Sequence, residues 1–194
     1  MYHELPAGAS LWPFLLTIDR ELAQTAQRQG CSCGGRLHRA DFPRKPRGHP
    51  DPLPDAYRRR FSFCCDREGC RKRTTPPSVR FLGRKVYLAA VVVLVSAMRQ
   101  GPSPRRVREL SRLFGADRRT IARWQLFWRD QFPQSPFWKV ARSRFTDAAS
   151  VTAALPAKLL EMFLHASDSV QDWGRLLQFL SPITISGALA IKQK

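Results

Sequence analysis

Acidic side chains are scarce in this sequence, which has 15 Asp and Glu residues against 33 Lys and Arg and a formal net charge of +18. Such an excess destabilises a compact state through self-repulsion, so we expect it to serve an anionic partner. Most of the cations are arginine, whose planar fork matches phosphate oxygens and the guanine edge. This bias favours nucleic acid over an anionic membrane surface.

Long apolar runs are also missing. Segment 86–98 is uncharged and strongly apolar, but it reaches only about two-thirds of a membrane span. The apolar stretch 11–18 is short, contains Pro13 and lacks a basic start, so it does not have the pattern of a secretory signal. We therefore expect no membrane partner, a buried helix around 86–98, and a cytoplasmic protein.

The positive charge is concentrated in two segments. Residues 36–85 carry 15 basic and 5 acidic side chains, and residues 99–144 carry 12 and 3. Residues 145–194 carry four of each. A generally basic, solvated surface would spread the charge more evenly, so this pattern indicates two nucleic-acid-contacting segments and a neutral tail.

The five cysteines form two clusters that suggest a metal site rather than disulfides. Cys31 and Cys33 precede two glycines, and Cys64, Cys65 and Cys70 follow about thirty residues later. Structural zinc takes four ligands in a tetrahedron, and two short turns, or knuckles, supply two each. An odd number of cysteines also argues against a closed disulfide framework.

The ligands that we favour are Cys31, Cys33, Cys65 and Cys70. Four residues separate Cys65 from Cys70, which is the upper end of the usual spacing in a knuckle, whereas five separate Cys64 from Cys70. In strand geometry Phe61, Phe63 and Cys65 share one face, and Cys64 points away. Two alternatives are His38 as a substitute ligand and a set of buried, inert cysteines. The gap between Cys31 and Cys33 is one residue, shorter than is usual.

Hydrophobic periodicity predicts a mainly α fold with a small β zinc-ribbon module, a three-helix helix-turn-helix core and C-terminal helices. A strand-like run covers 57–65, within a segment whose prolines exclude a long helix. The expected helices cover 10–29, 84–99, 104–114, 118–132, 155–166 and 170–180, and the run 183–194 is ambiguous. The domains that we expect are an N-terminal helix (1–30), a zinc-ribbon-like module (31–83), a helix-turn-helix domain (84–133) and a helical region with a dimerisation role (134–194).

Two of these helices fit a helix-turn-helix. The helix 104–114 and the helix 118–132 are joined by Gly115-Ala116-Asp117, a short turn with glycine. The second helix of such a motif enters the major groove by its N-terminal residues. With Ile121 and Trp124 facing the core, the candidate DNA contacts are Arg118, Arg119, Thr120, Ala122, Arg123 and Gln125. Backbone contacts are expected from the arginines and lysine around the second knuckle: Arg58, Arg59, Arg60, Arg71, Lys72 and Arg73. An ordinary helical hairpin with a basic face is the alternative.

The order of knuckle, strand, knuckle, apolar helix and helix-turn-helix over about 31–132 resembles the N-terminal part of bacterial insertion-sequence transposases. The string from Phe114 to Trp124 is also similar to the recognition segment of serine invertases and resolvases. The first resemblance implies a zinc ribbon beside a helix-turn-helix that binds terminal repeats, in a bacterial nucleoid-associated protein. The second implies that Arg119 and Arg123 touch bases.

The sequence lacks the catalytic residues of those families. After residue 132 it offers only Asp147, Glu161, Asp168 and Asp172 as acids, with no strand pattern to present a metal-binding triad. We therefore expect no enzyme activity, a structural Zn²⁺, double-stranded DNA as partner, and a homodimer or partner-protein contact through 137–194. The alternatives are the DNA-binding subunit or fragment of a transposase or nuclease with a catalytic partner, and a zinc-containing RNA-binding protein.

Overall fold

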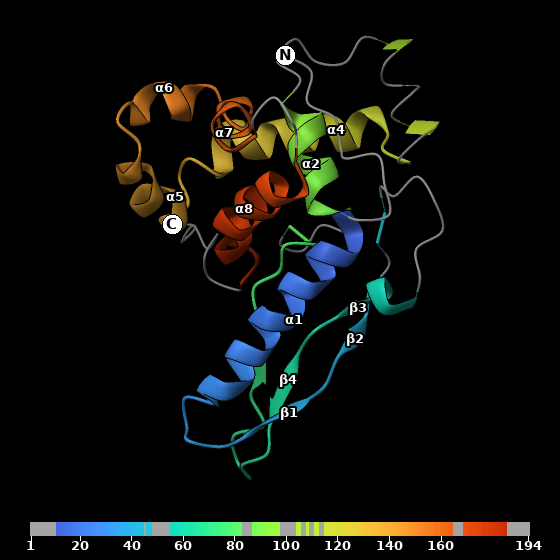
Figure 1. Cartoon of the computed structure of the whole chain (residues 1–194), viewed down its shortest axis with the longest axis vertical. Coiled ribbons are helices and arrows are strands. Elements are labelled where there is room, and N and C mark those ends of the chain that lie inside the picture. Colours follow the sequence, from blue (N-terminus) through green and yellow to red (C-terminus); the bar gives the residue numbers. More distant parts are fainter. Residues whose placement is uncertain are drawn as a thin grey trace.

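The computed structural model describes residues 11–44, 46–47, 55–82, 87–97, 104–105, 108, 111–112, 115–164 and 169–185. It is mainly helical with a small antiparallel β part, as predicted. Figure 1 shows a helical body, formed by residues 87–97, 115–164 and 169–185, and a β arm, formed by residues 31–44 and 55–74, which extends away from it.

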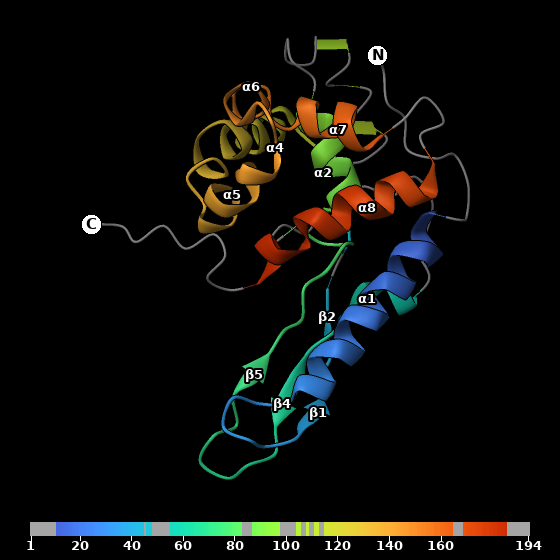
Figure 2. The same cartoon turned by 60° about the vertical axis from the view of Figure 1, so that its left-hand side comes forward.

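Helix α1 (Leu11–Gln29) runs beside the β arm (Figures 1 and 2). Its buried stripe recurs at three- and four-residue spacing and includes Leu11, Leu15 and Ile18. Gly30 follows with φ +71°, in the left-handed region that ends many helices, and its N–H donates to Gln27 O at 3.1 Å. The predicted helix and its glycine stop are confirmed over the described residues.

The described part of the β arm forms two small antiparallel sheets. The larger has the order β1-β4-β5, and the smaller pairs β2 with β3. Because Leu37 pairs with Cys65 across the β1–β4 ladder, the sheet brings the two cysteine-bearing turns to the same end of the arm. The strands are β1 (Leu37–Arg39), β2 (Phe42–Pro43), β3 (Arg59–Arg60), β4 (Phe63–Cys65) and β5 (Arg73–Thr74).

The strand-like run 57–65 is interrupted in the structure. A 3₁₀ turn, η1 (Asp55–Arg58), occupies its start, and β3 and β4 share the remainder with a break between them. The predicted alternation holds over β4, where Phe63 and Cys65 are buried and Cys64 is only half-buried, but not before it, since Ser62 is buried as fully as Phe61.

The apolar helix α2 (Ala89–Ser96) begins five residues later than predicted. Tyr87 and Leu88 lie in extended bridges to Arg47 and Phe81, which hold the chain out of the helix until Ala89. Residues 83–86 and 98–100 lie outside the described part of the chain. Among the described residues, no helix has both the length and the apolarity needed to cross a membrane.

Helix α4 (Arg118–Leu126) starts where the sequence predicts. Asp117 caps it by accepting a 2.7 Å hydrogen bond from Thr120 N, and Gly115 adopts φ +64° in the preceding turn. The last turn before Phe132 is a π-helix, η2 (Phe127–Gln131), in which Phe132 N donates to Phe127 O at 2.8 Å. Of the predicted helix 104–114, residues 104–105, 108 and 111–112 are described as helical, and the others lie outside the described residues.

The C-terminal third is helical, as predicted, but more divided. It contains α5 (Pro136–Ala141), η3 (Arg142–Arg144), α6 (Ala148–Ala153), α7 (Ala157–Phe163), α8 (Val170–Leu180) and η4 (Ser181–Thr184). The helix predicted over 155–166 is shorter, and α8 has the predicted bounds. The ambiguous final run begins in η4, and residues 186–194 lie outside the described part.

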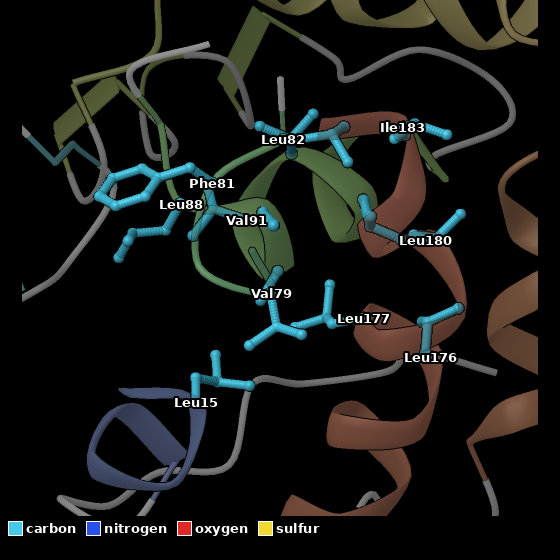
Figure 3. Packing of buried hydrophobic residues seen from close by; sticks show 14 of the residues in the cluster. Leu15, Val79, Phe81, Leu82, Leu88, Val91, Leu176, Leu177, Leu180 and Ile183 are labelled. Carbon is cyan, nitrogen blue, oxygen red and sulfur yellow. The ribbon is translucent and has the colours of Figure 1, made fainter. Parts of the chain in front are cut away.

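A single cluster of buried side chains joins these elements. Figure 3 shows Leu15 of α1, Val79, and Leu176 and Leu177 of α8 gathered beneath α2. The apolar stripe of α8 is therefore buried within its own chain, and Trp173 and Leu176 have no exposed surface. Elements from all four predicted domains contribute to this cluster, and their boundaries remain predictions.

A buried ion pair also holds the β arm to α1. Asp19 and Arg80 side chains are fully buried, with Arg80 Nε 2.7 Å from Asp19 Oδ2. The same carboxylate accepts from Ser78 Oγ and Val79 N, each at 2.7 Å. Arg80 also donates to the carbonyl oxygens of Tyr57 and Arg59. Because each charged group has several partners, this network fixes α1 against residues 78–80 and, through Arg80, against residues 57–59.

Candidate metal centre and basic surfaces

The four cysteines predicted as ligands come together at the far end of the β arm. Sγ of Cys31 lies 3.7 Å from Sγ of Cys70, and Sγ of Cys33 lies 3.5 Å from Sγ of Cys65. All four sulfurs lie within 4.8 Å of one another. Sulfurs about 2.3 Å from a tetrahedral ion are about 3.8 Å apart, so the four thiols can hold a metal ion.

Backbone conformation at each turn places the thiols. In the first knuckle Gly34 has φ +83° and donates to Cys31 O at 2.8 Å. In the second knuckle Gly69 has φ +80°, and Arg71 adopts φ +44° directly after Cys70. A non-glycine residue in this left-handed region is uncommon. The turn therefore imposes its conformation on Arg71.

Three backbone N–H groups point at the sulfurs. They belong to Gly35, Arg67 and Lys72, each two residues after the cysteine that it contacts. The hydrogen bond from Gly35, with further ones from Cys70 and Cys65, lowers the pKa of Cys33 to about 6. Burial raises the pKa of Cys65 to about 12. In the thiol state the cluster thus has one thiol that ionises readily and one that does not.

The alternative ligands lie outside the cluster. Cys64 Sγ contacts Arg71 O at 3.4 Å and Cys65 O at 3.7 Å instead of the other sulfurs. His38 Nε2 lies 3.3 Å from Asp66 Oδ2, on a side chain that is 68% exposed. The same Asp66 carboxylate accepts from Arg36 N at 2.9 Å and so ties the two knuckles together.

Helix α4 presents an exposed basic face. Arg118, Arg119 and Arg123 are exposed, as is Ala122 between them. Gln125 is half-buried. On the opposite face Ile121 and Trp124 are buried, as predicted.

Tyr87 fixes the entry to this helix. Its ring meets Trp124 edge-on at 4.8 Å between centroids, and its hydroxyl donates to Gly115 O at 2.6 Å. The turn and the buried face of α4 are thus held by one side chain. No feature of the sequence singled out Tyr87 for this role.

Two predicted DNA contacts need correction. Arg60 is only 3% exposed, and its guanidinium donates to Pro76 O. It faces inward because the β2–β3 pair turns alternate side chains to opposite sides. Thr120 is 7% exposed, and its hydroxyl accepts from Arg123 at 3.1 Å. Thr120 therefore lies in the buried stripe of α4 rather than on its outward face.

The other predicted backbone contacts, Arg58, Arg59, Arg71, Lys72 and Arg73, are exposed. Arg73 also donates to Ala40 O and Ser62 Oγ, so it has a structural role across the arm. Arg58 Nη1 lies 3.7 Å from Asp55 Oδ1.

Comparison of the chain with protein-family models, with curated proteins and with solved structures finds no match.

Proposed function

We propose that this chain is a non-enzymatic, sequence-specific DNA-binding protein with a structural zinc ion, which recognises a terminal repeat or operator of the kind that mobile elements carry. The observation that carries the proposal is the outward face of α4. It exposes three arginines within six residues at the N-terminal end of a helix whose opposite face is anchored. This arrangement suits entry into a major groove.

Arg119 and Arg123 are the proposed base-reading residues. Four positions apart on a helix, they lie on the same side. A guanidinium donates two parallel hydrogen bonds to O6 and N7 of guanine, and each such pair contributes about 1–3 kcal/mol of discrimination. Arg118, at the first position of α4, is suited to a phosphate, and the small exposed side chain of Ala122 lets the helix approach the bases.

The zinc ion has a structural role in this proposal. Four sulfur donors in a tetrahedral arrangement are typical of structural zinc. The β arm has too few apolar side chains between its short strands to be stable alone, and metal binding supplies the missing folding free energy. Cys31, Cys33, Cys65 and Cys70 would hold the ion as thiolates, and the three backbone N–H groups would stabilise their charge.

The β arm and α4 are proposed to contact one duplex at separate places. Figure 1 shows α4 in the helical body and β1 and β4 at the opposite end of the long axis. Arg71 and Lys72 follow Cys70 in the second knuckle and are exposed. Phosphate contacts by these residues would position the protein on DNA, while α4 reads bases.

The test is selection from a random duplex library by the full-length, zinc-loaded protein. We expect a defined motif to be enriched, and Arg119→Ala or Arg123→Ala to remove the preference at particular base pairs. Arg129→Ala is the matched control, since Arg129 is also exposed but its Nε lies 2.7 Å from Asp130 Oδ1. It should select the wild-type motif.

Two outcomes would contradict the proposal. If no motif is enriched although the protein binds duplexes tightly, sequence-specific recognition is wrong. If Arg119→Ala and Arg129→Ala select the same motif, recognition does not use the outward face of α4.

Elemental analysis of the purified protein should give one zinc per chain.

A further inference from the structure

A hollow of about 520 Å³ lies between the last turn of α1 and the first knuckle. Gln27 and Arg28 line it from the helix, and Arg36 and His38 line it from the start of β1. Figure 2 shows the corresponding region, where the chain leaves α1 and turns into β1.

Both arginines are available to a ligand. Arg28 and Arg36 are exposed. Arg28 makes one long contact, 3.5 Å from Nη2 to Thr25 Oγ1. Arg36 donates its backbone N–H to Asp66 Oδ1 at 2.9 Å, and within the described part of the chain its guanidinium is paired with no acceptor. The Asp66 carboxylate is itself engaged by Arg36 N and His38.

Glycines make the wall of the hollow approachable. Gly30, Gly34 and Gly35 all line it. A Cβ atom added to Gly34 would meet nothing within 4 Å, so this position faces open space. A tetrahedral anion can therefore approach the backbone at Gly34, in the hollow that Arg28 and Arg36 both line.

The local charge favours an anion even when the metal is bound. Residues 28–39 and 64–73 carry seven basic and two acidic side chains. Four thiolates around one Zn²⁺ add a charge of −2, so the surroundings keep about +3. The carbonyl end of α1 repels anions weakly, and Arg28 in its last turn offsets that field.

We propose that this hollow seats a phosphodiester group of the DNA backbone, with Arg28 and Arg36 as its cationic contacts. The inference rests on the proposed DNA binding and adds to it a defined site for one phosphate beside the metal centre. Guanidinium groups on either side of a phosphate can each donate charge-assisted hydrogen bonds to its oxygens.

The first arm of the test measures the salt dependence of binding to a fluorescein-labelled duplex of arbitrary sequence by anisotropy. Each phosphate contact contributes about 0.9 to the slope of log K against log salt concentration, so losing this one phosphate site in Arg28→Gln/Arg36→Gln should flatten the slope by about 0.9. Arg20→Gln/Lys158→Gln removes the same charge from positions outside the hollow and should keep the wild-type slope. Equal slopes for the two double variants would overturn the proposal.

The second arm separates this site from the function as a whole. Inorganic phosphate should shift the backbone amide NMR signals of Gly34 and Gly35 in the wild type, and not in Arg28→Gln/Arg36→Gln. Shifts without duplex binding would support the hollow and contradict the proposed function. Duplex binding with no shifts, and with equal slopes for the two double variants, would support the proposed function and contradict the hollow as a phosphate site. If Arg28 only stabilises the end of α1, its removal lowers the melting temperature and leaves both readouts unchanged, which also overturns the proposal.

Discussion

Gly35 lies so close to Cys65 that a Cβ atom at position 35 would be 2.5 Å from the Cys65 sulfur. A Cβ atom and a sulfur that are not bonded to each other cannot lie that close, so one of them would have to move. The contact joins the first knuckle to a ligand of the second, so the backbone at Gly35 forms part of the wall of the metal centre. It also explains why two glycines follow Cys33: Gly34 adopts a positive φ, and Gly35 leaves room for the Cys65 sulfur.

Gly35→Ala should therefore weaken metal binding. The added methyl group displaces the Cys65 sulfur or the first knuckle, and either movement distorts the tetrahedral arrangement of the four sulfurs. Gly34→Ala is the matched control: it meets no atom within 4 Å but has φ +83°, so it should cost about 1–2 kcal/mol of stability and keep the coordination. The charge-transfer spectrum of the Co²⁺-substituted protein reports the geometry. An unchanged spectrum in Gly35→Ala would show that the contact is not a constraint.

Cys33→Ser and Cys64→Ser should differ sharply. Cys33 lies 3.5 Å from the Cys65 sulfur, whereas Cys64 is hydrogen-bonded to backbone oxygens outside the cluster. We expect Cys33→Ser to lose tight zinc binding and the order of the β arm, while α8 and the rest of the helical body remain folded. Cys64→Ser should bind zinc as the wild type does. Zinc competition with a chromophoric chelator and amide hydrogen exchange measure the two effects. Zinc loss in Cys64→Ser alone would reverse the ligand assignment.

Asp19→Asn should destabilise the whole chain. It removes the charge that offsets a fully buried Arg80, and breaking one partner of a buried pair costs about 3–5 kcal/mol. Asp55→Asn removes a carboxylate that is 97% exposed and should leave the free energy of unfolding unchanged. Urea denaturation followed by tryptophan fluorescence gives both values. A small effect at Asp19 would mean that Arg80 finds its stabilisation in the carbonyl oxygens alone.

Gly174→Ala should loosen the packing of α8 on α1. A Cβ at Gly174 would lie 2.5 Å from Phe14 Cε1 and 3.4 Å from Ile18 Cδ1, so the helices must separate or the ring must turn. Overpacking of this kind costs about 1–3 kcal/mol. Adding Phe14→Leu should recover part of the loss, which a double-mutant cycle on thermal unfolding measures. Additive effects of the two substitutions would show that the helices do not meet at this point.

Local features of the sequence were sufficient for several parts of the fold. Gly30 ends α1, Asp117 caps α4 and α8 has the predicted bounds, because each depends on residues within a few positions. The preference for Cys65 over Cys64 as part of the cysteine cluster also came from strand alternation. Alternation needs only local geometry, and the four sulfurs do lie together without Cys64.

The sequence by itself determined the cysteine turns, the basic face of α4 and the mainly helical character of the chain, since short-range periodicity and turn chemistry produce them. Only the tertiary structure decided the late start of α2, the burial of Arg60, the Asp19–Arg80 pair and the hollow beside Arg28 and Arg36. These depend on segments tens of residues apart in the chain, such as Asp19 and Arg80. No local pattern specifies which distant side chain or backbone oxygen will complete a buried group, because that choice is made by the packing of the whole chain.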